Sequence, residues 1–295
     1  MTIGLGELFS LSCALAWAAA VILFKKSGES LAPFALNLIK NAFVLPLFLL
    51  TILLTQGLQG PAIPATALTW VLVSGFLGIA AGDTLYFRAL NTLGASRIAA
   101  AQTLYSPFVI LLSLAFLGER LRLLQFAGVA VVLGGIFLVT WSPARERVDA
   151  ASLRRGVAWA VLSVFLMAIG VVIAKPLLER YDFLWVVTLR IVGGLGGMLA
   201  IALVRRQFGE LRAAYARVRH WPAILVGGFI GTYLSMMLWL AGYKYTQASI
   251  AAVLNELAAV FILLLAALFL RERVGLRQWA GTLLALAGVV LVVAA

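Results

Sequence analysis

The sequence has very few of the side chains on which metal sites and catalytic triads depend. Cys13 is the only cysteine and His220 the only histidine among 295 residues. One cysteine cannot form an intramolecular disulfide or a thiolate cluster, and one histidine at a loop end cannot build a histidine-based metal site or triad. The chain also has no Walker loop for a nucleotide. We therefore predict no catalytic residue, no metal and no cofactor.

Charged residues are scarce as well. They make up 12% of the chain and hydrophobic residues 64%, against about 25% and about 45–50% in a typical soluble domain. So much apolar surface predicts lipid as the solvent. The net charge of +12 would suggest nucleic acid if the basic residues formed a stripe on one face. They form short clusters between apolar runs instead, which predicts a lipid bilayer as partner and no nucleic acid.

Long apolar runs fill most of the chain. A membrane-crossing helix needs about 20 mostly apolar residues, and the sequence offers ten such segments. They are 4–24, 32–54, 67–90, 96–117, 121–141, 156–177, 183–204, 221–243, 248–270 and 275–294. The first is followed, not preceded, by lysines, so we interpret it as a retained helix rather than a signal peptide. The predicted fold class is an all-α polytopic membrane protein with ten transmembrane helices.

Lysine and arginine are concentrated in the loops that follow odd-numbered spans. Those loops carry Lys25, Lys26, Arg145, Arg147, Arg154, Arg155, Arg205, Arg206, Arg212, Arg217, Arg219, Arg271, Arg273 and Arg277. The loops after even-numbered spans carry only Arg120, Arg122, Arg180 and Lys244. Because basic loops stay in the cytoplasm, this bias predicts both termini outside, in a multi-pass protein of the cell inner (plasma) membrane.

The chain contains an internal repeat. A shift of 153 residues aligns Phe76–Val139 with Phe229–Val292 without a gap. Each copy holds five spans, an odd number, so the second copy enters the membrane from the opposite side. We predict two inverted five-helix repeats, 1–142 and 143–295. Two such halves can exchange conformations, so that a central site faces each side of the membrane in turn.

A short motif occurs once in each repeat. Gly-Glu-Arg-Leu at 118–121 is followed by Gln125 and Gly128, and Arg-Glu-Arg-Val at 271–274 by Gln278 and Gly281. The sequence thereby resembles the drug/metabolite transporter superfamily with two EamA-type domains, and within it the YddG-type amino-acid and metabolite exporters. The resemblance implies secondary transport of small molecules rather than catalysis. It also implies both termini in the cytoplasm, the reverse of the charge bias.

Four ionisable residues lie well inside the predicted spans, namely Lys40, Asp83, Arg190 and Glu256. Each costs about 2.5–3.5 kcal/mol in mid-membrane, so each must face another, a wet cavity or helix-end carbonyls. Lys40 and Arg190 hold similar places in the two repeats; such cations either bridge helices or bind a substrate carboxylate. The acids either form static ion pairs, carry protons or bind an ammonium group. Their repeat counterparts are Met236 and Thr103, which predicts an asymmetric site.

Aromatic and amide side chains complete the predicted site. Deep aromatic residues line cavities as readily as they pack in cores. Gln102 and Asn255 are repeat equivalents that offer donors and acceptors without fixed charge, either to a substrate or to another helix. The predicted substrate-binding residues are Trp17, Lys40, Asp83, Tyr86, Gln102, Tyr105, Trp159, Arg190, Tyr233, Trp239, Asn255 and Glu256.

Glycine and proline positions indicate packing and moving parts. Pro46 and Pro107 are expected to interrupt spans two and four. The glycine-rich run at 193–197 predicts close helix contact or a hinge in span seven. Pairs of glycines seven residues apart indicate that spans five and ten are packing helices. These pairs are Gly128 with Gly135 and Gly281 with Gly288.

Mixed charges beside aromatics and amides favour amino acids as the exported solute. An organic-cation exporter is the first alternative, and it would depend on Asp83 or Glu256. A nucleotide-sugar or phosphate-ester carrier is the second, and it would use Lys40 and Arg190 together. A membrane-embedded enzyme would need a convergent set of acids, bases or ligands, which the sequence does not show. Monomer and homodimer both stay open.

Overall fold

A computed structural model describes residues 4–27, 32–57, 60, 62–93, 101–140, 149–216, 221–269 and 275–294. Within these ranges the chain is helical and has no strand. The elements are α1 (Leu5–Ser27), α2 (Pro33–Gln56), α3 (Ala65–Gly75), η2 (Phe76–Gly82), α4 (Asp83–Leu93), α6 (Tyr105–Phe116), α7 (Leu123–Thr140), α8 (Ala150–Arg180), α9 (Phe183–Val204), α10 (Phe208–Ala216), α11 (Trp221–Gly228), η3 (Phe229–Leu234), α12 (Ser235–Tyr245), α13 (Ala248–Asn255), α14 (Ala258–Phe269) and α15 (Leu276–Ala294).

The predicted membrane segments are helices in the structure. Over the described ranges, seven helical stretches are long and apolar enough to cross a membrane. Three shorter apolar helices, Leu5–Ala20, Tyr105–Phe116 and Leu123–Val139, occupy the other predicted segments. The all-helical membrane fold is therefore confirmed. Helix α8 is longer than predicted, because the Asp149 carboxylate caps it by accepting the first free backbone N–H groups.

The repeat found in the sequence is also present as matching irregularities of the backbone. Two π-helices, η2 and η3, begin 153 residues apart, at Phe76 and Phe229. The fourth span is broken by a turn at 103–104 and the ninth by a turn at 256–257, again at equivalent positions. Short π-helical segments within α-helices are frequent at functional sites. Among the described residues, the spans whose backbone departs from a regular helix are thus the third, fourth, eighth and ninth.

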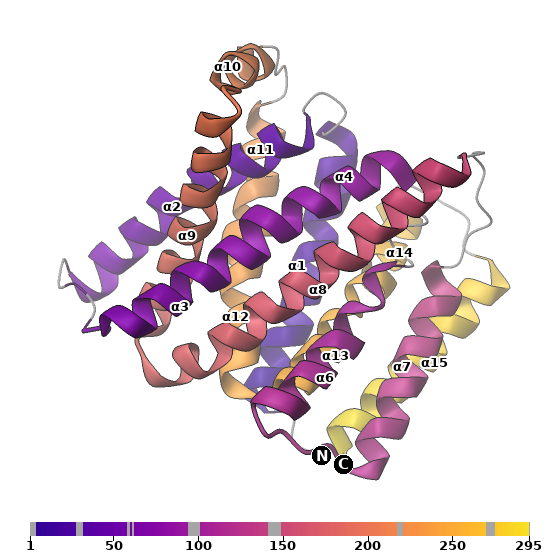
Figure 1. The fold of residues 1–295 in the computed structure, drawn as a ribbon. Coiled ribbons are helices and arrows are strands. Elements are labelled where there is room, and N and C mark those ends of the chain that lie inside the picture. Colours follow the sequence, from indigo (N-terminus) through magenta and orange to yellow (C-terminus); the bar gives the residue numbers. More distant parts are fainter. Residues whose placement is uncertain are drawn as a thin grey trace.

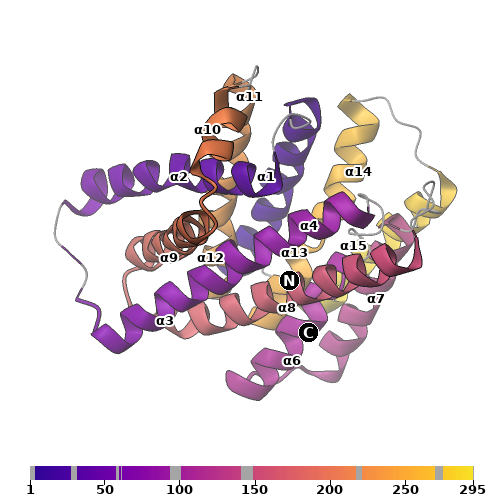
Figure 2. The ribbon, with the colours of Figure 1, turned by 45° about the horizontal axis from the view of Figure 1, so that its top comes forward.

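The two halves of the chain interlock. Helix α1 packs against α12 and α14 of the second half, and α8 packs correspondingly against α4 and η2 of the first. Figures 1 and 2 show α4 and α8 running side by side. Most of the core therefore lies between the repeats rather than within either one. The predicted boundary between residues 142 and 143 falls outside the described residues and stays a prediction.

Helices α7 and α15 form a close pair at one edge of the molecule (Figures 1 and 2). Glycines line the seam on both sides. A Cβ atom on any of them would approach the partner's backbone closer than 3.0 Å. These glycines are Gly128, Gly135, Gly281 and Gly288. The expectation that spans five and ten are packing helices is confirmed.

Adding one methyl group to this seam should destabilise the protein. Gly135→Ala would place its Cβ against the α15 backbone near Gly281 and Ala285, and overpacking of this kind costs about 1–3 kcal/mol. Gly134→Ala is a matched control, because its Cβ would meet only the Leu284 side chain at 3.9 Å. We expect thermal unfolding in detergent to show a lower midpoint for Gly135→Ala alone. Equal midpoints for the two variants would contradict the close seam.

The other glycine and proline expectations have different outcomes. Gly193 and Gly194 lie in an unbroken α9. Gly193 lies against the α3 backbone at Leu72 and Gly194 against the Ile79 side chain of η2, so close contact, not a hinge, explains them. Pro46 lies inside a continuous α2, so the expected interruption of span two is wrong. A membrane helix tolerates an internal proline when its neighbours hold its shape. Pro107 follows the break at 103–104 and lies in the first turn of α6.

Candidate functional site

Arg190 is a fully buried cation at the centre of the helical bundle. It projects from α9 and its side chain is 1% exposed. Its Nη1 donates to Ser74 Oγ and, at 2.8 Å, to the Gly170 carbonyl. Its Nε has no hydrogen-bond partner, and no carboxylate of the described residues pairs with it. Arg190 thus carries a positive charge that the described part of the protein does not neutralise.

Aromatic side chains surround this guanidinium. The Arg190 guanidinium lies 5.8 Å from the Trp239 ring centroid, within the range of a cation–π contact. The Trp239 and Tyr243 rings meet edge to face at 5.4 Å. The Tyr243 hydroxyl shares a hydrogen bond of 2.9 Å with the Tyr105 hydroxyl. The Arg190 guanidinium therefore lies beside a group of aromatic side chains, two of which are joined through their hydroxyl groups.

Glu256 lies where the two broken helices meet. It stands in the turn between α13 and α14, and its carboxylate accepts a hydrogen bond of 3.1 Å from the Ser106 hydroxyl. Ser106 follows the equivalent break in the other repeat. Ser106 also follows Tyr105 directly, and the Tyr105 hydroxyl bonds that of Tyr243. Glu256 thus belongs to one cluster with Arg190, although no ion pair joins them.

A second cluster holds the other predicted charges. Lys40 Nζ and Asp83 Oδ2 form an ion pair at 2.9 Å between α2 and α4, with side-chain exposures of 13% and 22%. Nearby along α4, Tyr86 is hydrogen-bonded to Gln102. Tyr86 and Trp159 pack on the same small apolar core between α4 and α8. Here the cation has its own counter-ion, in contrast to Arg190.

The repeat explains this contrast. Lys40 and Arg190 hold similar places in the two halves, and Lys40 pairs with Asp83. The position equivalent to Asp83 in the second half is Met236, which cannot pair with Arg190. One of two related cations is therefore neutralised within the protein and the other is not.

Three of the predicted site residues have no contact with the charged groups of these two clusters among the described hydrogen bonds and ion pairs. The Tyr233 hydroxyl is 2.5 Å from Thr51 Oγ1, and the ring stacks on Phe229, so this residue packs against α2. Trp17 lies on α1 with 38% of its surface exposed. Asn255 donates to the Ala251 carbonyl of its own helix at 2.7 Å, and its Oδ1 has no partner. The amides Gln102 and Asn255 thus do not form a pair.

Two charged residues have structural roles that were not predicted from the sequence. The Glu119 carboxylate accepts from the backbone N–H groups of Ala248 and Ser249, at 2.5 and 3.1 Å, and so caps α13. Lys175 Nζ donates to the carbonyls of Tyr243 and Thr246, at 2.9 and 2.8 Å, and so closes the end of α12. The role of Glu119 could have been suspected from the sequence, because this residue belongs to the motif at 118–121. The matching motif at 271–274 lies outside the described residues.

Ten apolar segments, matching backbone irregularities and interlocked halves define a multi-pass helical membrane protein built from two related repeats. The chain belongs to the EamA-like transporter family, whose profile matches residues 4–141 and 154–294. Two Archaeoglobus fulgidus proteins, each described as an uncharacterized transporter, are similar to it. One is 24% identical over 274 residues, 93% of this chain and 92% of the relative. The other is 25% identical over 282 residues, 94% of each chain.

A protein of known crystal structure has the same fold. It superimposes with a TM-score of 0.78 over 97% of this chain and 95% of its own, at 18% sequence identity. At that identity the likeness concerns the fold alone. The family match shows that the chain is a transporter, and the superposition shows that its helical fold recurs in another protein.

Proposed function

We propose that this transporter exports small carboxylate-bearing metabolites, amino acids above all, across the plasma membrane by alternating access. The observation that supports the proposal is Arg190, a buried guanidinium with a free Nε and no acidic partner among the described residues. A buried charge without a counter-ion is costly. A carboxylate accepts two parallel hydrogen bonds from a guanidinium. A substrate carboxylate is therefore the group that completes this site.

The remaining groups of the Arg190 cluster suit the rest of an amino acid. Glu256 pairs with no cation of the described residues and is available to an ammonium group. Trp239, Tyr105 and Tyr243 offer aromatic surface and hydroxyl groups to a side chain. Lys40 and Asp83 neutralise each other, and in this proposal they hold α2 to α4 rather than bind the solute.

Alternating access requires that a closed site can open. Arg190 and Tyr243 are fully buried here, so the site is closed to solvent in this structure. The helix breaks at 103–104 and 256–257 lie at the site, and each is a point where a helix half can tilt. Glu119 ties α13 to the end of α6 on one side of the membrane. We propose that opening toward that side releases this contact.

An organic-cation exporter is the second candidate, and Glu256 favours it. A carboxylate without a cationic partner in the described residues can bind a cation directly. In that case Glu256 alone would govern transport and Arg190 would be dispensable. A phosphate-ester carrier is less well supported, because it needs Lys40 beside Arg190 and Lys40 is paired with Asp83.

Transport by purified protein in liposomes tests the proposal. Vesicles loaded with unlabelled solute would be assayed for counterflow of radiolabelled amino acids, organic cations and phosphate esters, with and without a pH gradient. Vesicles without protein are the control. We expect counterflow of amino acids. Counterflow of another class with none for amino acids would refute the proposal, and stimulation by the gradient would show that protons are coupled.

A further inference from the structure

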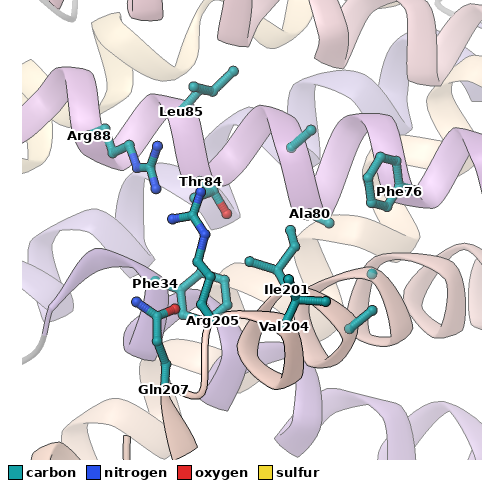
Figure 3. A pocket seen from close by; sticks show the side chains of 13 residues that line it. Phe34, Phe76, Ala80, Thr84, Leu85, Arg88, Ile201, Val204, Arg205 and Gln207 are labelled. Carbon is teal, nitrogen blue, oxygen red and sulfur yellow. The ribbon is translucent and has the colours of Figure 1, made fainter. Parts of the chain in front are cut away.

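A cleft of about 490 Å³ lies away from the central site, between the first turn of α2, the η2–α4 segment and the end of α9. Figure 3 shows its lining side chains. It borders the end of the membrane where the basic loops gather, because Arg205 begins the loop after span seven. Its volume is within the range of about 300–1,000 Å³ that is usual for small-molecule sites.

One end of the cleft is strongly basic. The side chains of Arg88 and Arg205 converge there, close to Thr84 (Figure 3). Neither guanidinium forms an ion pair with any carboxylate of the described residues. Two arginines converging without an acid repel each other unless an anion lies between them. A phosphate group suits this position, because a guanidinium binds phosphate oxygens in pairs.

Thr84 gives an independent indication of a ligand. It is 9% exposed, and its hydroxyl has no hydrogen-bond partner. Buried hydroxyls are bonded in the great majority of cases, so an orphan needs an explanation. This hydroxyl lies beside the two guanidinium groups (Figure 3), where it can donate to the same anion. Gln207, at the same end, adds an amide.

The other end of the cleft is apolar. Phe76, Ile201 and Val204 form its walls, and small residues such as Ala80 and Ala200 leave room between them. No charged residue lines this end. A free phosphate or a soluble phosphate ester would leave this surface uncovered. An acyl chain would cover it, and the adjoining helical stretches Ala65–Tyr86 and Phe183–Val204 are long and apolar enough to cross a membrane.

We propose that this cleft binds one anionic phospholipid, with the phosphate between Arg88 and Arg205 and an acyl chain along Ala80 and Ala200. Basic pockets between transmembrane helices on the cytoplasmic side are suited to anionic headgroups, and the charge bias predicts that this is the cytoplasmic side. The lipid would join α2, α4 and α9, which are elements of both repeats. The proposal does not depend on which solute the central site carries.

Thermal unfolding and native mass spectrometry of the full chain in detergent test this site. Phosphatidylglycerol and phosphatidylcholine with the same acyl chains would be added to the wild type and to the Arg88→Gln/Arg205→Gln double variant. We expect phosphatidylglycerol to raise the unfolding midpoint and bind selectively, and the double variant to bind it at least about tenfold more weakly. Arg154→Gln/Arg155→Gln, exposed at the start of α8, is the charge-matched control.

Two single variants test the cleft without changing the net charge of the protein. Thr84→Val removes the hydroxyl and Ala200→Phe fills the apolar end, and both should weaken phosphatidylglycerol binding with Arg88 and Arg205 intact. Equal binding of the two lipids, or equal loss in the two double variants, would overturn the proposal. Competition by inorganic phosphate with no effect of Ala200→Phe would also overturn it, because the cleft would then be a free-anion site.

Discussion

Arg190→Gln will lower amino-acid transport by about 10- to 150-fold, which is the fold-change that corresponds to the about 1.5–3 kcal/mol of a hydrogen bond to a charged group. Glutamine keeps a donor near Ser74 and Gly170, the present partners of Arg190, but it cannot bind a carboxylate as a charged fork. The folded protein should be as stable as the wild type or more so, because an uncompensated buried charge is removed. Initial uptake rates over a range of solute concentrations, together with unfolding midpoints, measure both effects.

Two further variants show whether charge or geometry matters at this position. Arg190→Lys keeps the charge but loses the paired donors, so transport should fall between wild type and Arg190→Gln. Arg180→Gln removes an equal charge at the end of α8, far along the helix from the site, and should transport normally. Wild-type transport by Arg190→Gln would exclude Arg190 as the carboxylate receptor.

Single substitutions of the Lys40–Asp83 pair will destabilise the protein, and the double substitution will recover most of the loss. Lys40→Met leaves Asp83 without its counter-ion, and Asp83→Asn does the same to Lys40. Breaking a buried pair costs about 3–5 kcal/mol, and an exposed pair about 1 kcal/mol or less. This pair is partly buried, so each single variant should fall between these limits.

A double-mutant cycle of unfolding midpoints measures the coupling. Because the pair is proposed to hold helices together, the double variant should also keep amino-acid transport. Additive losses of stability would show that the two charges do not interact. A stable double variant that has lost transport would place Lys40 and Asp83 in the substrate site instead.

The sequence was sufficient to predict the ten apolar segments and the repeat. A membrane helix can be recognised in a sequence because it needs a long run of apolar residues. The repeat can be recognised because identical residues, such as Glu119 and Glu272, recur at one constant spacing without a gap. The π-helices η2 and η3 were not predicted, because their apolar residues fit an α-helix equally well. The prediction that Pro46 interrupts span two was wrong, because the surrounding residues form a continuous helix in spite of the proline.

The charged residues inside the spans could be found from the sequence, but their partners could not. A charge inside an apolar span is conspicuous because it is costly, and this identified Lys40, Asp83, Arg190 and Glu256. Which charges meet depends on which helices are neighbours, and apolar spans carry little information about that. Glu119 caps a helix whose first residue, Ala248, lies 129 residues further along the chain. This contact could be identified only from the structure, in which α6 and α13 are neighbours.

Counterflow of a matched pair of solutes in wild-type proteoliposomes addresses the role of the unpaired arginine most directly. The pair is an aromatic amino acid and the amine that differs from it only by lacking the carboxylate. We expect the amino acid to exchange and the amine to exchange at least about tenfold more slowly, because only the former can neutralise Arg190. Equal exchange of the two solutes, or faster exchange of the amine, would contradict a carboxylate site and favour an organic-cation exporter centred on Glu256.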